Sequence, residues 1–145
     1  MTADQIFTLT NPLAMIGWIL LAVAPHREWV TRVVTGLVIP AIFAVAYVAI
    51  VATTFAGAEG SFGSLRGVQQ LFSNPWLLLA GWLHYLAFDL LVGTWEARDA
   101  VARRIPRWLL IPCLFLTLMF GPTGWLLYMI VRRVTPQTAT EFSAA

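Results

Sequence analysis

PWLLLAGWLHYLAFDLLVGTWEARD, residues 75–99, is the stretch that decides the fold. It exceeds the roughly 20 mainly apolar residues that cross a bilayer, so we expect a membrane-spanning helix over residues 75–97. The stretch nevertheless contains His84, Asp89 and Glu96, and Asp99 closes it. An acid deep in a spanning helix costs about 2.5–3.5 kcal/mol on insertion scales. Such a residue is usually paired and is a candidate for function.

A helix with this sequence would separate its side chains onto two faces, at about 100° per residue. The ionisable groups and most of the aromatic residues fall in an arc of about 160° that begins at His84. The opposite arc, which we expect to face lipid, holds Leu83, Leu86, Ala87 and Leu90. The polar face predicts either a functional site or a structural pair of His84 and Asp89 buried against a neighbouring helix.

The composition of the whole chain is that of a membrane protein with one domain. Of its 145 residues, 59% are hydrophobic and only 11% are charged, against about 25% charged in soluble domains. The net charge of +2 is too small and too dispersed to favour nucleic acid as a partner. The single Cys113 excludes a disulfide framework. All nine basic residues are arginine, which indicates a genome rich in G and C.

Three further apolar runs predict spans over residues 5–24, 33–56 and 108–131, with a kink at Gly121-Pro122 in the last one. Residues 62–73 are weakly amphipathic and predict a short helix at the membrane interface. The predicted fold class is therefore all-α, an integral membrane four-helix bundle.

The distribution of arginine predicts the orientation of this bundle. The connectors after the first and third spans hold six arginines: Arg27, Arg32, Arg98, Arg103, Arg104 and Arg107. The termini and the middle loop hold Arg66, Arg132 and Arg133. Because cytoplasmic loops are enriched in basic residues, we expect both termini outside the cytoplasmic membrane.

Two sequence echoes suggest an internal repeat. The run NPLAMIGW from Asn11 to Trp18 resembles NPWLLLAGW from Asn74 to Trp82, and residues 37–43 resemble residues 109–115. We therefore consider two copies of a two-helix hairpin, related by an axis along the membrane normal. Because only the second copy carries the ionisable residues of 75–99, we expect it to be the active half.

The first role open to these residues is acid–base catalysis on a lipophilic substrate, with His84, Asp89 and Glu96 as catalytic groups. Burial disfavours the charged form of any group, so a proton donor and a proton acceptor can coexist near neutral pH. Aromatic and amide side chains could line the substrate slot, although aromatic residues at helix ends also act as interfacial anchors. The candidate substrate-binding residues are Asn11, Trp18, Trp82, Tyr85, Phe88 and Trp95.

Two other roles remain open. A metal site would use His84 with the acids, but Asp89 and Glu96 lie about 10.5 Å apart along the helix, a poor ligand spacing. We therefore predict no metal ligands. Proton or solute translocation along the acidic stripe is the other role. Four short spans leave little room for alternating access in one protomer, so a carrier would require a homo-oligomer.

The run HYLAFDL, residues 84–90, preceded by Gly81-Trp82, resembles the neoxanthin-synthase-like family, named for a plant protein lacking in an abscisic-acid-deficient mutant. Asn11-Pro12 and the run GPTG at 121–124 support the resemblance, which covers about residues 5–131. It implies a small four-helix membrane protein. Plant members are implicated in converting violaxanthin into neoxanthin, an isomerisation that opens an epoxide and creates an allene.

The resemblance implies a chemistry for the polar helix. Asp89 would protonate the epoxide oxygen and His84 would remove a carbon-bound proton, with Glu96 assisting; the two main roles could be exchanged. An isomerisation requires no redox cofactor. We expect a bacterial protein without a plastid transit peptide, in which another epoxidised or cyclic isoprenoid could replace violaxanthin. The alternative is a membrane protein that binds or protects carotenoid without catalysis, or a small proton-coupled carrier.

Overall fold

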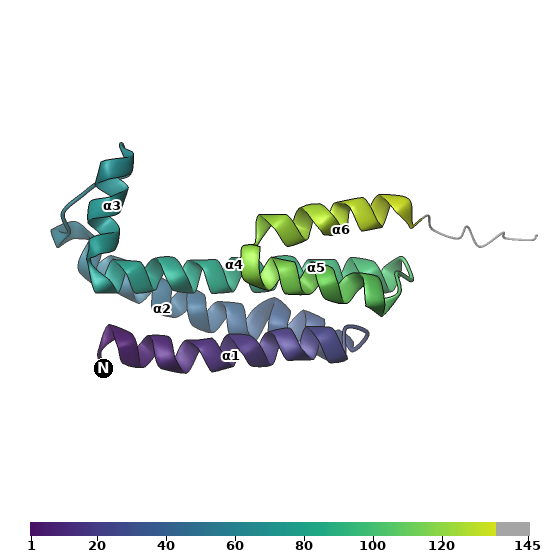
Figure 1. Cartoon of the computed structure of the whole chain (residues 1–145). Helices are drawn as coiled ribbons and strands as arrows, with labels where there is room; N and C mark the ends of the chain where they lie inside the picture. The colour runs from purple at the N-terminus through teal and green to yellow at the C-terminus, as the bar shows by residue number, and fades with distance from the viewer. Residues whose placement is uncertain (136–145) are drawn as a thin grey trace, which may run out of the picture.

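The computed structural model describes residues 1–135, which are helical along most of their length (Figure 1). The helices are α1 Ala3–Val23, the π-helix η1 Val30–Val38, α2 Ile39–Thr54, the 3-10 helix η2 Phe55–Gly57, α3 Leu65–Ser73, α4 Pro75–Ala102, α5 Arg107–Phe120 and α6 Pro122–Val134. No strand occurs within residues 1–135. The all-helical class predicted from the sequence is confirmed.

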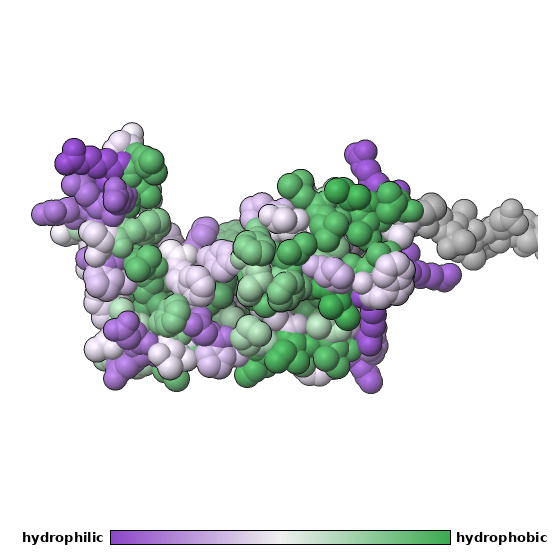
Figure 2. All heavy atoms as spheres, viewed as in Figure 1, coloured by the Kyte–Doolittle hydropathy of each residue, from purple (hydrophilic) through white to green (hydrophobic). Residues whose placement is uncertain are grey.

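Three helical segments are long and apolar enough to cross a membrane: α1, the continuous run Val30–Gly57 and α4. They lie side by side, and α3 stands across one end of the bundle (Figure 1). Figure 2 shows hydrophobic residues over the middle of the molecule and hydrophilic residues gathered at its two ends. The chain is therefore a membrane protein built as a helical bundle.

The start of α4 follows directly from its sequence. Asn74 caps the helix, because its Oδ1 accepts a hydrogen bond from the Trp76 N–H at 2.9 Å. Pro75 occupies the first helical position, where its missing N–H costs nothing. With its first turn held by these two residues, α4 runs without interruption for 28 residues.

The π-helix η1 precedes Pro40, which has no N–H to continue a regular ladder. Within η1 the Thr35 hydroxyl donates to the Val30 carbonyl at 3.1 Å and accepts from the Thr94 hydroxyl of α4 at 2.9 Å. Both threonines are buried. Hydrogen bonds of this kind help membrane helices associate, so η1 is tied to the central part of α4.

The expectation that the leucine-rich arc of α4 faces lipid is wrong. Leu83 and Leu90 are 0% exposed, and Leu86 and Ala87 are also buried, whereas Phe88 is exposed. Leu90 packs closely over Gly17 of α1, where an added Cβ would lie 3.0 Å from a leucine methyl. Lipid tails are as apolar as leucine, so apolarity alone does not tell a membrane helix's packed face from its lipid face.

The predicted fourth span over residues 108–131 is also corrected by the structure. It forms two short helices, and α6 folds back along α5 instead of continuing (Figure 1). The 14 residues of α5 extend about 21 Å, which is shorter than a bilayer core of about 30 Å. Arg132 in the last turn of α6 reaches Asp99 near the end of α4 at 2.8 Å, which a straight fourth span would make impossible. We call α5 and α6 together the hairpin.

Glycine allows the hairpin to turn. Gly121 has a φ of +43°, a backbone conformation that other residues rarely adopt. An added Cβ on Gly124 would clash with the Thr117 backbone nitrogen, so only glycine lets α6 begin this close to α5. The run GPTG therefore makes a full reversal of the chain and not the predicted kink.

The reversal changes the relation between the chain ends. The start of α1 lies at the end of the bundle where α4 begins, and Arg132 lies where α4 ends. Ala3 and Thr135 therefore lie at opposite ends of the bundle, whereas the sequence predicted both termini on the same side of the membrane. The predicted internal repeat would make Val30–Gly57 and Arg107–Val134 alike. They differ, because Val30–Gly57 is continuous and Arg107–Val134 is folded back.

Candidate functional site

Asp89 lies over the turn of the hairpin. An added Cβ on Gly121 would lie 3.1 Å from the Asp89 Oδ1 and 3.3 Å from its Oδ2. The Oδ2 atom is buried and has no hydrogen-bond partner among residues 1–135. Leaving a buried polar atom unpaired is costly, so such an atom requires an explanation. A proton or a bound molecule at this carboxyl would provide one.

Tyr85 lies one turn before Asp89 on the same side of α4. Its hydroxyl donates to the Leu118 carbonyl at 2.7 Å and also neighbours the Asp89 carboxyl. In a continuous helix, the Leu118 carbonyl would accept from residue 122, but Pro122 has no N–H. Tyr85 therefore satisfies a carbonyl that the turn leaves open, and it brings a hydroxyl beside Asp89.

Trp82 extends this group toward α1. Its indole N–H donates to the Asn11 side-chain oxygen at 2.8 Å, and its ring centroid lies 5.3 Å from that of Tyr85. Trp82 also lines an apolar cavity of about 510 Å³ between α1, α3 and α4, which we call the first groove. The residues of the first groove include Asp4, Phe7, Phe72, Leu78, Gly81 and Trp82. The structure thus brings together Asn11, Trp82, Tyr85 and Asp89.

His84 packs against α2, whereas Asp89 lies against the hairpin. Its ring centroid lies 5.7 Å from that of Tyr47 on α2 and 4.6 Å from that of Phe88. It lines an apolar cavity of about 530 Å³ between α2, α3 and α4, which we call the second groove. The residues of the second groove include Tyr47, Phe55, Phe62, Phe72, Gly81 and His84. His84 and Asp89 therefore do not face each other across one cavity.

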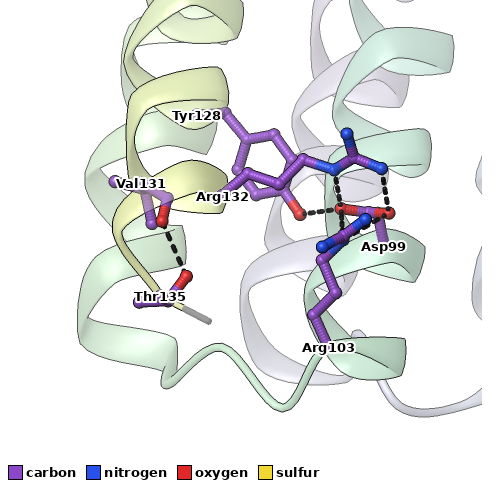
Figure 3. Close-up of polar contacts among 6 residues, drawn as sticks. All are labelled: Asp99, Arg103, Tyr128, Val131, Arg132 and Thr135. Carbon is purple, nitrogen blue, oxygen red and sulfur yellow. Dashed lines mark hydrogen bonds and ion pairs between the residues drawn. The ribbon is translucent and has the colours of Figure 1, made fainter. Parts of the chain in front are cut away.

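The other two carboxyl groups of α4 are held by protein donors. Glu96 is 0% exposed, and the Thr117 hydroxyl lies 3.0 and 3.1 Å from its two oxygens. Asp99 accepts from the Tyr128 hydroxyl at 2.7 Å and from Arg132 at 2.8 Å, with Arg103 at 3.1 Å (Figure 3). Within residues 1–135 no group of three His, Cys, Asp or Glu side chains is placed to hold a metal ion.

Trp18 and Trp95 lie away from both grooves. Trp18 is buried against Gly93, where an added Cβ would lie 2.6 Å from the indole ring. Trp95 packs edge-on against Tyr128 with a centroid distance of 5.5 Å, and the Arg132 guanidinium lies 5.8 Å from the Trp95 centroid. Both predicted substrate-binding residues are thus packed against other side chains, and the buried Trp18 Nε1, like Asp89 Oδ2, has no hydrogen-bond partner among residues 1–135.

The chain matches the ABA4-like family, described as ABA DEFICIENT 4-like, over residues 5–128. It belongs to that family. This confirms the resemblance inferred from residues 84–90 and connects the ABA4-like chain with carotenoid- and xanthophyll-related processes. No curated protein and no solved structure matches it.

Several residues that shape the site of this ABA4-like protein were not singled out from its sequence. Thr117 holds Glu96, and the Leu118 carbonyl holds Tyr85. A polar residue in an apolar run, four positions before Gly121, was the available signal for Thr117. Phe72 lines both grooves, but in the sequence it is one of several apolar residues of an amphipathic segment. Its position over α4 depends on the tertiary fold.

Proposed function

We propose that this ABA4-like protein isomerises an oxygen-bearing isoprenoid of the carotenoid class inside the membrane, by proton transfer at Asp89. The observation that supports this most is the buried Asp89 oxygen without a partner, at the turn of a hairpin that enters the bundle. An ionisable residue within a spanning helix is a functional candidate by default. Glu96 and Asp99 have protein donors, which leaves Asp89 as the carboxyl best placed to exchange a proton with a substrate.

Asp89 alone can donate the proton that an epoxide-opening isomerisation requires and then take one back from the substrate. In its neutral form it donates a proton to the epoxide oxygen as the carbon–oxygen bond breaks. The resulting carboxylate then takes a proton from the neighbouring carbon, and the electron pair of that carbon–hydrogen bond forms the new double bond. The carboxylic acid is regenerated and no redox change occurs. The Tyr85 hydroxyl beside Asp89 would stabilise the carboxylate between the two transfers by turning its single proton from the Leu118 carbonyl to Asp89.

This assignment changes the roles expected for the other predicted catalytic residues. His84 lies in the second groove and Glu96 lies beneath the hairpin, so neither is placed to act as the base for a substrate at Asp89. Trp82 lines the first groove and packs against Tyr85, which neighbours Asp89; Asp89 itself lines neither groove. We propose that Trp82 and Asn11 hold the apolar body of the substrate and that His84 contributes to binding.

A carotenoid-binding protein without catalysis is the second candidate. It is favoured by the second groove, which is lined by aromatic residues and contains His84 as its ionisable group. Ligand sites are commonly apolar cavities of 300–1,000 Å³ with a few polar groups. A binder would keep a stoichiometric pigment through purification, and that pigment would depend on the aromatic residues rather than on Asp89.

The test is pigment chromatography of a bacterial host that accumulates epoxidised xanthophylls, with and without this protein. The wild type is expected to give a new isomer with an allenic absorption spectrum, and Asp89→Asn is expected to abolish it. Glu28→Gln makes the same carboxyl-to-amide change at an exposed residue and should retain the product. Unchanged pigments with wild-type protein present in the membrane, or full activity of Asp89→Asn, would contradict the proposal.

A further inference from the structure

Three aromatic residues from three helices line the first groove. Phe7 of α1, Phe72 of α3 and Trp82 of α4 each leave part of their surface uncovered there. The Phe7 and Trp82 ring centroids lie 5.5 Å apart, and the hydrogen bond from the Trp82 N–H to Asn11 fixes the indole orientation. Gly81 lets the Phe72 ring lie against α4, because an added Cβ would be 3.0 Å from Phe72 Cε1. The groove is therefore walled by aromatic rings that other residues hold in place.

One acid lies beside these rings. Asp4 lines the first groove and precedes Phe7 by three positions on α1, so the two side chains are neighbours on the helix surface. No basic residue lines the groove. Within residues 1–135 the Asp4 carboxylate forms no ion pair. The described part of the chain thus supplies a negative charge at this groove and no cation to neutralise it.

Aromatic rings next to a carboxylate favour an organic cation as a ligand. An ammonium ion within about 6 Å of a ring centroid is attracted to the negative face of the ring. Because the Phe7 and Trp82 centroids are 5.5 Å apart, one cation can lie within this distance of both. Asp4 adds an opposite charge and a strong hydrogen-bond acceptor. An anionic group would meet repulsion from Asp4 and no basic partner in the groove.

The position of the groove indicates where such a cation comes from. Asp4 and Pro75 line it where α1 and α4 begin, at an end of the bundle where hydrophilic residues gather (Figure 2). Leu78 and Trp82 line its inner part, and α4 rises about 10.5 Å from Pro75 to Trp82. A cation near Asp4 joined to an apolar chain over Leu78 matches a phospholipid. A free amine would leave the apolar part of the groove empty.

We propose that the first groove binds a membrane phospholipid whose headgroup ends in an amine or a quaternary ammonium ion. The headgroup nitrogen lies within reach of Asp4, Phe7 and Trp82, and the phosphate stays in the aqueous interface. One acyl chain follows the seam between α1 and α4. Asp89 does not line this groove, so the inference goes beyond the proposed function and does not rest on it.

Native mass spectrometry of the protein in detergent micelles that contain equal amounts of phosphatidylethanolamine and phosphatidylglycerol tests this inference. The two lipids are chosen with the same acyl chains, and their headgroups end in an ammonium ion or in neutral glycerol. The wild type should retain phosphatidylethanolamine over phosphatidylglycerol by about fivefold, the equivalent of about 1 kcal/mol. Asp4→Asn removes the charge, and Phe7→Leu removes the ring but keeps an apolar side chain. Each should lower the preference to less than about twofold.

Two matched variants separate recognition in the groove from general effects. Glu59→Gln removes one negative charge before α3, at the same end of the bundle, but Glu59 does not line the first groove. Phe55→Leu makes the aromatic change in the second groove. Both should keep the wild-type preference. Equal retention of the two lipids by the wild type would overturn the inference, and so would an equal loss of preference in Glu59→Gln and Asp4→Asn.

The lipid measurement is independent of catalysis. Asp89→Asn is expected to lose isomerisation and to keep the preference for phosphatidylethanolamine. If the pigments stay unchanged while the lipid preference and its loss in Asp4→Asn are observed, only the proposed function fails. If the wild type isomerises pigment but retains both lipids equally, only the lipid inference fails.

Discussion

Three carboxylic acids on one helix differ mainly in the groups that surround them. Asp99 faces two arginines and a tyrosine hydroxyl, Glu96 faces one threonine hydroxyl, and one oxygen of Asp89 faces no donor among residues 1–135. Charge-assisted hydrogen bonds account for Asp99 as a structural residue. Residue type alone therefore does not identify the functional acid. The partner atoms contributed by the hairpin distinguish the three.

Replacing Tyr85 by phenylalanine should lower the free energy of unfolding by about 1 kcal/mol, because the Leu118 carbonyl loses its hydrogen bond from the Tyr85 hydroxyl and Pro122 offers no backbone N–H in its place. Thermal unfolding in detergent, followed by circular dichroism, would measure the loss. Tyr47→Phe is the matched control, since it keeps the ring that packs on His84. Equal stability of Tyr85→Phe and the wild type would show that the hydrogen bond does not hold the turn.

Gly121→Ala should destabilise the protein by about 1–3 kcal/mol, the usual range for one residue held in a strained backbone conformation. The added methyl group would also lie 3.1 Å from Asp89 Oδ1 and should disturb the carboxyl. Turnover is therefore expected to fall together with stability. Gly57→Ala, measured in the same unfolding assay, should show neither effect. A Gly121→Ala protein with normal stability would argue against the reversal at this residue.

At the scale of elements, the hairpin is what separates this structure from a simple four-span bundle. Arg132 ties the end of α6 to α4 through Asp99, and Tyr128 reaches the same carboxylate (Figure 3). The Asp99 and Arg132 side chains are only 17% and 30% exposed, so solvent screens this ion pair less than it would an exposed pair. The ion pair and the hydroxyl together keep α6 against the bundle.

Arg132→Ala should therefore lower the free energy of unfolding, because Asp99 loses the charge-assisted hydrogen bond that ties α6 to α4. Arg133→Ala removes the same charge from the neighbouring, exposed position and should change stability by less than about 0.5 kcal/mol. Thermal unfolding of both variants under identical conditions makes the comparison. Equal effects of the two substitutions would mean that net charge, and not the contact with Asp99, supports the hairpin.

The sequence predicted the apolar elements well and the hairpin poorly, for a physical reason. The runs that form α1 and α4 are long enough for one span each, and Asn74-Pro75 marks the start of α4. Residues 108–131 are equally compatible with a kinked span and a reversal. The choice depends on contacts between distant residues, namely Asp99 with Arg132 and Tyr85 with Leu118. No local pattern reports such contacts.

The candidate site shows the same division between local and distant information. Helical periodicity separated His84 from Asp89 by about 140°, and the structure places them against different neighbours. Periodicity does not show which neighbour each residue meets, so it does not separate a catalytic pair from two residues in different surroundings. Likewise, the sequence does not show that the Trp18 ring packs against Gly93.

At the scale of the whole molecule, the hairpin collects the arginines at one end. Arg132 and Arg133 join the six arginines of the two connectors, so eight of the nine arginines lie at the end of the bundle where α4 finishes, and Arg66 lies at the other. Because cytoplasmic segments are enriched in arginine, we propose that this end faces the cytoplasm and that the N-terminus lies outside. This orientation puts α3 and both grooves toward the outer surface.

Cysteine labelling of intact cells with a membrane-impermeant maleimide tests the orientation. In a Cys113→Ala background, Glu59→Cys before α3 should be labelled from outside, and Thr135→Cys after α6 should be labelled only once the cells are opened. Cys113 is the single cysteine of the sequence, so its replacement leaves the introduced cysteine as the labelling site. Labelling of both positions in intact cells would restore the four-span topology expected from the sequence.

The fold-back of α6 has a consequence for the order in which the protein is assembled. The ribosome makes α4 before it makes the hairpin, so the newly inserted helix has Glu96 without Thr117 and Asp99 without Arg132. With 14 and 13 residues, α5 and α6 are each too short for a spanning helix, so they must settle against helices that are already in place. The final step of biogenesis thus supplies the donors that make the acids of α4 compatible with the bilayer. A chain that ends before residue 107 would leave Glu96 and Asp99 in the membrane without these hydrogen-bond donors.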